Sequence, residues 1–168
     1  MELEFITAGV IVNTHGIHGE VKVLPDGVEP RMMMKCGVLY VQGQPLRLLS
    51  GRVHKGCLLA KLEGIGNMDA ALALKGKAVS IRRADAGLAE GEYFDEELLG
   101  LVARNAETGE ELGRVVEVLN YPAHKIYTVE GGRDEYLIPA VPEFIAAVDV
   151  PGGTMDIHMM RGLGTHEN

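Results

Sequence analysis

Short runs of alternating apolar and polar residues recur along the chain, separated by glycine-containing turns at intervals of about 8 to 12 residues. In the clearest run, Met155, Ile157 and Met159 alternate with Asp156 and His158. A period of two places one set of side chains in a core and the other in water, as in a β-strand. Two further runs of this kind cover residues 20–23 and 126–129. The pattern predicts a mainly β protein, built as small barrels or sandwiches.

One segment has the signals of a helix instead. Asn67 is a good N-cap, Asp69 lies in the first turn, and residues 70–74 are the helix formers Ala-Ala-Leu-Ala-Leu. Lys75 and Gly76 provide a basic last turn and a C-cap. We expect about two turns here, and because so short a helix is stable only when packed against something else, we expect it to plug the open end of a barrel.

The charge of the chain divides it into two parts. Its 168 residues carry a net charge of −8, but residues 1–83 hold eleven basic and seven acidic residues, a net of +4, and the remainder carries −12. The sign changes at residues 84–92, which are small, acidic and poor in large apolar side chains. We therefore predict an N-terminal domain at 1–83, a linker at 84–92 and a C-terminal domain at 93–168, ending in a frayed tail from 162 to 168. The first domain would tolerate RNA, and the second would attract a basic partner, although an acidic surface can also serve solubility alone.

The apolar content argues against a membrane protein. Its longest uninterrupted apolar runs have four or five residues, and the start of the chain lacks the basic region of a signal peptide. We expect a cytoplasmic protein with no membrane contact. Cys36 and Cys57 lie outside any Cys-x-x-Cys motif or Cys/His cluster, and are expected to be reduced structural thiols, with Cys57 buried in a strand.

The most conspicuous motif is residues 14–23, Thr-His-Gly-Ile-His-Gly-Glu-Val-Lys-Val. The two histidines His15 and His18, with Glu20 nearby, are potential metal ligands. A closed site needs three or four ligands, however, and no Cys is near them in the sequence. Gly16 and Gly19 are instead typical of a turn between strands at 6–13 and 20–24. The phosphate-binding fingerprints of nucleotide-binding proteins are absent, as is a nucleophilic serine motif. We expect no metal, no cofactor and no catalytic residue.

A second candidate is the aromatic pair Tyr93 and Phe94, which is followed by Asp95, Glu96 and Glu97. The pair could anchor a basic partner, with the charges steering the encounter. Because neighbouring side chains of an extended segment point to opposite faces, we expect one ring to be buried and the other exposed. The three acids are expected to form a solvated face.

Four blocks in this order resemble the RimM family of ribosome maturation factors, and the resemblance spans nearly the whole chain. They are residues 9–23, with His-Gly-Ile-His-Gly-Glu-Val at 15–21 close to the family's His-Gly-Ile-Arg/Lys-Gly-Glu-Val, then 70–76, 91–100, and 137–140 through 148–149. The resemblance implies a translation-factor-like six-stranded barrel followed by a PRC barrel. It also implies a protein without enzymatic activity that docks on the head of the maturing small ribosomal subunit, contacts ribosomal protein S19 and promotes 16S rRNA processing.

The resemblance also suggests which residues make the contacts. The family's paired tyrosines fall on Tyr93 and Phe94, so that the second hydroxyl is missing here. The chain departs from the family pattern at three further places. His18 stands where the family has Arg or Lys, and Glu97 stands where it has Asp. Residues 121–125 read Tyr-Pro-Ala-His-Lys, where a Gly-Ala-His/Asn-Asp turn is common in the family. The predicted partner-binding residues are Tyr93, Phe94, Asp95 and Glu96 in the second domain and His15, Gly16, His18 and Lys22 in the first.

Two functions follow from the sequence. The first is a monomeric ribosome assembly chaperone, in which the acidic domain binds ribosomal protein S19 and the weakly basic domain lies against rRNA or the same protein. The alternative is a small β-barrel that binds a cofactor such as a flavin or nucleotide, as a carrier or an enzyme, since small barrels have many functions. An absorbance scan and a metal assay on the purified protein would separate the two.

Overall fold

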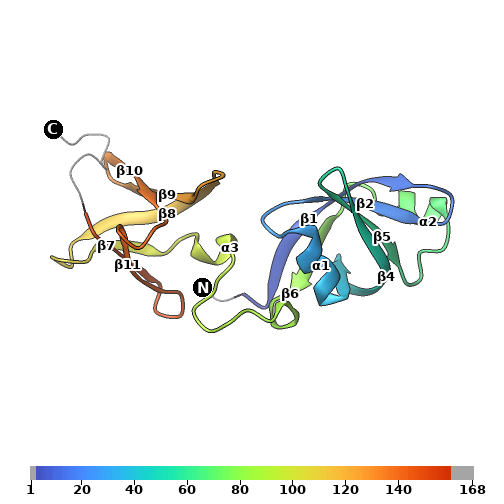
Figure 1. The fold of residues 1–168 in the computed structure, drawn as a ribbon, viewed down its shortest axis with the longest axis horizontal. Helices are drawn as coiled ribbons and strands as arrows, with labels where there is room; N and C mark the ends of the chain where they lie inside the picture. Colours follow the sequence, from blue (N-terminus) through green and yellow to red (C-terminus); the bar gives the residue numbers. More distant parts are fainter. Residues whose placement is uncertain (1–2, 160–168) are drawn as a thin grey trace. The chain divides into compact units, whose positions relative to one another are not determined.

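The computed structural model describes residues 3–159 of the chain, which form two compact units divided along the sequence between Glu90 and Gly91 (Figure 1). This division falls inside the predicted linker 84–92. The predicted tail at 162–168 lies outside the described residues.

The first unit is a closed six-stranded barrel with strand order β1-β2-β5-β4-β3-β6 (Figure 1). Every neighbouring pair is antiparallel. The predicted six-stranded barrel is thereby confirmed. Its elements are β1 (Phe5–His15), β2 (Glu20–Pro25), α1 (Pro30–Cys36), β3 (Val38–Val41), β4 (Gln44–His54), β5 (Cys57–Leu62), α2 (Met68–Leu72), β6 (Ala78–Arg82) and the 3-10 helix η1 (Arg83–Ala86).

Alternation along the strands builds the core of this barrel. Val21 and Val23 of β2 and Leu58 and Ala60 of β5 have no solvent exposure. Lys22, between the two valines, is half-buried and belongs to the opposite, outward row. The inner face of the sheet is therefore apolar, and the outer face carries the charged residues.

Two short helices complete the first unit. In α2, the Asn67 side chain accepts a hydrogen bond from the Ala70 amide at 2.8 Å, which confirms the predicted N-cap. The helix packs against β1 and β2 through the fully buried Ala71, but it ends at Leu72 rather than near Gly76. The expected second turn is replaced by tighter i to i−3 bonds, such as Lys75 amide to Leu72 carbonyl.

The helix α1 was not predicted from the sequence, although Pro30 in its first turn and Gly37 at its C-cap mark both ends. Its Met33 is fully buried. The helix also packs against η1, whose Ala86 is fully buried. The first residues of the expected linker 84–92 are therefore part of the first unit.

The second unit is a six-stranded sheet of order β10-β9-β8-β7-β12-β11, in which β12 and β7 are parallel and the other pairs antiparallel. Its buried core includes Leu98, Leu101, Val129, Ile138 and Met155. Met155 and Ile157 are fully buried and Met159 packs against the same core, as the alternation predicts. The elements are α3 (Asp95–Leu98), β7 (Val102–Asn105), β8 (Glu111–Asn120), β9 (Lys125–Gly131), β10 (Asp134–Pro139), β11 (Ile145–Asp149) and β12 (Thr154–Ile157).

Candidate partner-binding surfaces

The predicted motif at residues 14–23 is the hairpin that joins β1 to β2. Its turn needs glycine at Gly19, which has φ +87° and whose added Cβ would lie 2.7 Å from the Ile65 carbonyl oxygen. The hairpin is thus packed closely against the loop between β5 and α2. His15, Gly16 and His18 are exposed on it.

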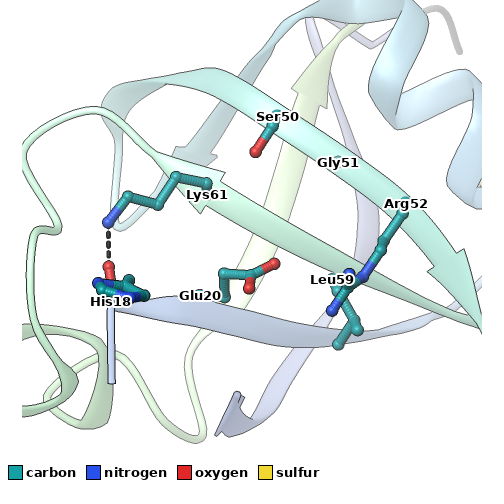
Figure 2. Close-up of a pocket in the computed structure, with 7 residues that line it drawn as sticks. All are labelled: His18, Glu20, Ser50, Gly51, Arg52, Leu59 and Lys61. Carbon is teal, nitrogen blue, oxygen red and sulfur yellow. Dashed lines mark hydrogen bonds between the residues drawn. The ribbon is translucent and has the colours of Figure 1, made fainter. Parts of the chain in front are cut away.

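Beside the hairpin, the outer face of β2, β5 and β4 is hollowed into a shallow cavity of about 370 Å³ (Figure 2). Its lining combines side chains from the hairpin and from two strands that are distant in sequence, namely His18, Glu20, Ser50, Gly51, Arg52, Leu59 and Lys61. The predicted residue His18 is therefore part of a larger arrangement.

Lys61 ties the wall of this cavity to the hairpin. Its ammonium donates to the His18 carbonyl oxygen (Figure 2). It also donates to the Ile65 carbonyl oxygen, at 3.0 Å. The Lys61 ammonium thus joins the β1–β2 hairpin to the loop between β5 and α2, against which Gly19 packs. Because an ammonium has three donors, Lys61 retains one beyond these two bonds for another partner.

Arg52 connects the cavity to the histidines at the end of β1 and β4. Its guanidinium nitrogen lies 3.3 Å from His15 Nε2, and the ring centroids of His15 and His54 are 6.4 Å apart. The strand register aligns Lys22 with Leu59 and Leu59 with Arg52 across the sheet. We call the resulting surface the basic face; its residues are His15, His18, Lys22, Arg52, His54 and Lys61.

The members of this face on β4 and β5 were not predicted from the sequence. Arg52, His54 and Lys61 are 29 or more residues beyond the hairpin in sequence. The pairing register that brings them beside it depends on the whole barrel. The signal within the sequence was only the basic charge of residues 1–83.

The second candidate surface lies at the start of α3. Phe94 is 9% exposed, and Tyr93 is half-buried and packs against the core of the second unit. The predicted alternation of one ring in and one ring out therefore holds only in part, because Tyr93 also packs inward. The Phe94 ring is largely withdrawn from a partner, whereas Tyr93 keeps an accessible part.

The three acids after this pair do not form the solvated face that was expected. Glu97 is fully buried and accepts a hydrogen bond from the Phe94 amide at 3.1 Å. Asp95 is half-buried and accepts from Lys125 at 2.5 Å and from Asn120 at 3.4 Å. The expectation was wrong because the first turn of α3 folds back on its own backbone and against β8 and β9. Of the three carboxylates, only that of Glu96 is in an exposed residue.

Burial, and secondarily the charge of Asp95, raises the pKa of the nearby Tyr127 hydroxyl. The Tyr127 hydroxyl therefore stays protonated to a higher pH than the hydroxyl of an ordinary tyrosine.

Within residues 3–159, no group of three or more His, Cys, Asp or Glu side chains is placed to hold a metal ion. In the same described part of the chain, none of the helices has the length and apolar content needed to cross a bilayer.

Cys36 and Cys57 are both free, with Cys57 buried at the start of β5 as predicted.

Comparison with known proteins gives matches along both units. Residues 6–86 match the family model of the RimM N-terminal domain, and residues 95–163 match that of the RimM PRC barrel domain. A ribosome maturation factor RimM of Bacillus cytotoxicus is 33% identical over 95% of this chain and 98% of its own, and one of Geobacter metallireducens is 32% identical over 95% of each. A crystal structure of a 16S ribosomal RNA processing protein RimM of Pseudomonas aeruginosa is 25% identical, with a TM-score of 0.46 over 93% of this chain and 98% of that one.

Both family models and the relatives agree along the chain, and together they bear out the predicted PRC barrel in the second unit. The chain therefore belongs to the RimM family of ribosome maturation factors.

Proposed function

We propose that this protein is a non-enzymatic assembly factor of the small ribosomal subunit, which acts in the cytoplasm as a monomer. In this proposal it binds the head of the immature subunit through ribosomal protein S19 and promotes maturation of 16S rRNA. Its membership of the RimM family supports the ribosomal role. The observation that carries the choice of a basic protein as partner is the net charge of −12 on residues 84–168.

The start of α3 is the proposed contact surface on the second unit. Tyr93 is a half-buried residue that supplies an aromatic ring, and Glu96, three residues further along the chain, is exposed and supplies a carboxylate. An aromatic anchor beside a carboxylate suits a basic partner, because the ring is desolvated on contact and the charge accelerates the encounter. In this proposal Asp95 and Phe94 act by holding this surface in shape, since one is paired with Lys125 and the other is largely buried.

The proposed mechanism involves no covalent step. A factor that binds one arrangement of rRNA and protein more tightly than others raises the population of that arrangement by mass action. The first unit would lie against rRNA of the same region, consistent with the net charge of +4 on residues 1–83, which make up most of it.

Co-sedimentation with purified immature and mature small subunits tests the proposal. We expect the full-length protein to pellet with immature subunits in preference to mature ones, and to bind purified ribosomal protein S19 in a manner weakened by salt. A folded preparation that binds neither the immature subunit nor the protein at any salt concentration would overturn the proposal.

A further inference from the structure

The basic face of the first unit has the composition of a surface for a polyanion. Arg52 and Lys61 line the cavity, and Lys22 flanks it. Glu20 is the one acidic side chain among the seven described residues that line the cavity. Cationic side chains gathered on one face release counterions when they meet phosphates, which drives binding to nucleic acid.

The floor of the cavity is apolar although it belongs to the outer face of the sheet. Leu59 is 1% exposed, and across the sheet it lies between Lys22 and Arg52. Long cationic side chains cover apolar surface with their stems and keep their charged ends in water. Arg52 lines the cavity on one side of Leu59, and Lys22 is the neighbour of Leu59 on the other side in the strand register.

The arrangement favours the backbone of a nucleic acid over its unstacked bases. Among the seven described lining residues none is Phe or Tyr, the usual large stacking platforms for single-stranded bases, and the one ring in the lining is the smaller His18 imidazole. The polar groups available are instead the Arg52 guanidinium, the Lys61 ammonium and the Ser50 hydroxyl. These donors suit phosphate oxygens.

Glu20 adds a group that phosphates do not require. Its carboxylate lies between the side chains of Lys61 and Arg52 in the cavity (Figure 2). An ionised carboxylate only accepts hydrogen bonds, so that among phosphates it would repel unless a hydroxyl or amino group of the ligand faces it. The sugar of RNA carries such a donor, the 2′-hydroxyl, beside each phosphate, and this group lines the wide minor groove of double-helical RNA.

We propose that the basic face binds double-helical RNA, with Arg52, Lys22 and Lys61 on phosphates and the Glu20 carboxylate accepting a hydrogen bond from a ribose 2′-hydroxyl. This inference rests on the proposed function, because it identifies the kind of RNA structure that the first unit would meet on the maturing subunit. It goes further by assigning the surface and the group that distinguishes RNA from DNA.

The test measures binding of the full-length protein to an RNA hairpin and to the DNA hairpin of the same sequence, by fluorescence anisotropy at several salt concentrations. We expect the wild type to bind the RNA hairpin more tightly. Arg52→Gln should weaken RNA binding by about 3- to 10-fold. It should also reduce the slope of the logarithm of the binding constant against the logarithm of the salt concentration by about one. Arg47→Gln is the matched control, because Arg47 is also an exposed arginine of β4 but does not line the cavity. Equal effects of the two substitutions would overturn the assignment of the surface.

Glu20 is tested by the ratio of RNA to DNA affinity rather than by either affinity alone. Removal of its charge in Glu20→Leu strengthens phosphate binding in both ligands, but the loss of the acceptor should abolish the preference for RNA. Glu20→Gln removes the charge and keeps an acceptor oxygen, so part of the preference should remain. If Glu20→Leu strengthens RNA and DNA binding equally, Glu20 only offsets positive charge and the hydroxyl contact is refuted.

The two proposals fail in different ways. If the wild type binds neither hairpin, or binds an acidic protein fragment in place of RNA, the inference is wrong. The proposed function still holds in that case if the same preparation co-sediments with immature subunits. Circular dichroism of each variant shows that the barrel is intact before its affinity is interpreted.

Discussion

The main-chain amide of Phe94 donates a hydrogen bond to the carboxylate of Glu97, 3.1 Å away, inside the second unit. The Glu97 amide in turn donates to the Phe94 carbonyl oxygen at 2.9 Å. This reciprocal pair fixes the first turn of α3 next to Tyr93. Since Glu97 has no solvent exposure, its carboxylate has a structural role in that turn.

Substitution Glu97→Ala should lower the free energy of unfolding of the second unit by about 1–3 kcal/mol, because it leaves the Phe94 amide without its partner. Glu96→Ala, at the exposed neighbouring position, should change it by less than about 0.5 kcal/mol. Urea unfolding followed by tyrosine fluorescence reports mainly this unit, which holds four of the five tyrosines. Equal stability of the two variants would contradict the role assigned to Glu97.

Tyr93→Ala should weaken association with immature subunits by about 1–2 kcal/mol or more, because the partly accessible ring is the proposed aromatic anchor. Leu137→Ala, which removes an exposed apolar side chain of β10, is the control and should leave the association unchanged. Sedimentation with a fixed amount of subunits measures both. Unchanged association of a folded Tyr93→Ala protein would assign Tyr93 to the core alone.

Gly19→Ala should destabilise the first unit by more than about 2 kcal/mol. The substitution combines a left-handed backbone with a Cβ placed 2.7 Å from the Ile65 carbonyl oxygen and 2.9 Å from the Asn67 nitrogen. Gly16→Ala carries only the backbone cost of about 1 kcal/mol, because no atom lies within 4 Å of an added Cβ. Hydrogen exchange of the β5 amides measures the stability of this unit. If Gly16→Ala proves the more damaging change, the close packing of the hairpin is refuted.

The pKa of the Cys36 thiol is raised, first by burial and then by the nearby Asp85 carboxylate, while Lys35 acts in the opposite direction. A raised pKa lowers the thiolate fraction at pH 8. Asp85→Asn should therefore shift the alkylation profile of Cys36 to lower pH and speed its reaction with iodoacetamide at pH 8 by roughly two- to five-fold.

Asp69→Asn on α2 is the control for this charge effect. Mass spectrometry of the peptides separates Cys36 from the buried Cys57. An unchanged rate in Asp85→Asn would show that η1 does not hold its carboxylate beside α1 in solution.

The local features of the fold could be predicted because their causes are local. Alternation identified the strands around Val21 and Met155, and the Asn67 cap marked the start of α2. The end of α2 could not be predicted from Gly76, because its amide bonds to the Ile11 carbonyl of β1 instead of continuing the helix. That bond depends on the finished barrel.

The candidate surfaces show the same limit. The hairpin residue His18 was identified from its motif, but Lys61 reaches it only through strand pairing. Glu97 resembles any surface carboxylate in the sequence, and its burial follows from the fold of α3 on β8. A residue whose partner is remote in the chain therefore gives no local signal.

The parallel pairing of β12 with β7 has a consequence for synthesis of the protein. Residues Thr154–Ile157 fill the position between β7 and β11, so β7 and the edge strand β11 are not joined into one sheet until these residues have been made. The first unit can fold as soon as the chain up to Glu90 has left the translating ribosome. While the second unit waits, the β7 edge remains open to other nascent chains, which makes prompt release of the last strand a safeguard against misassembly.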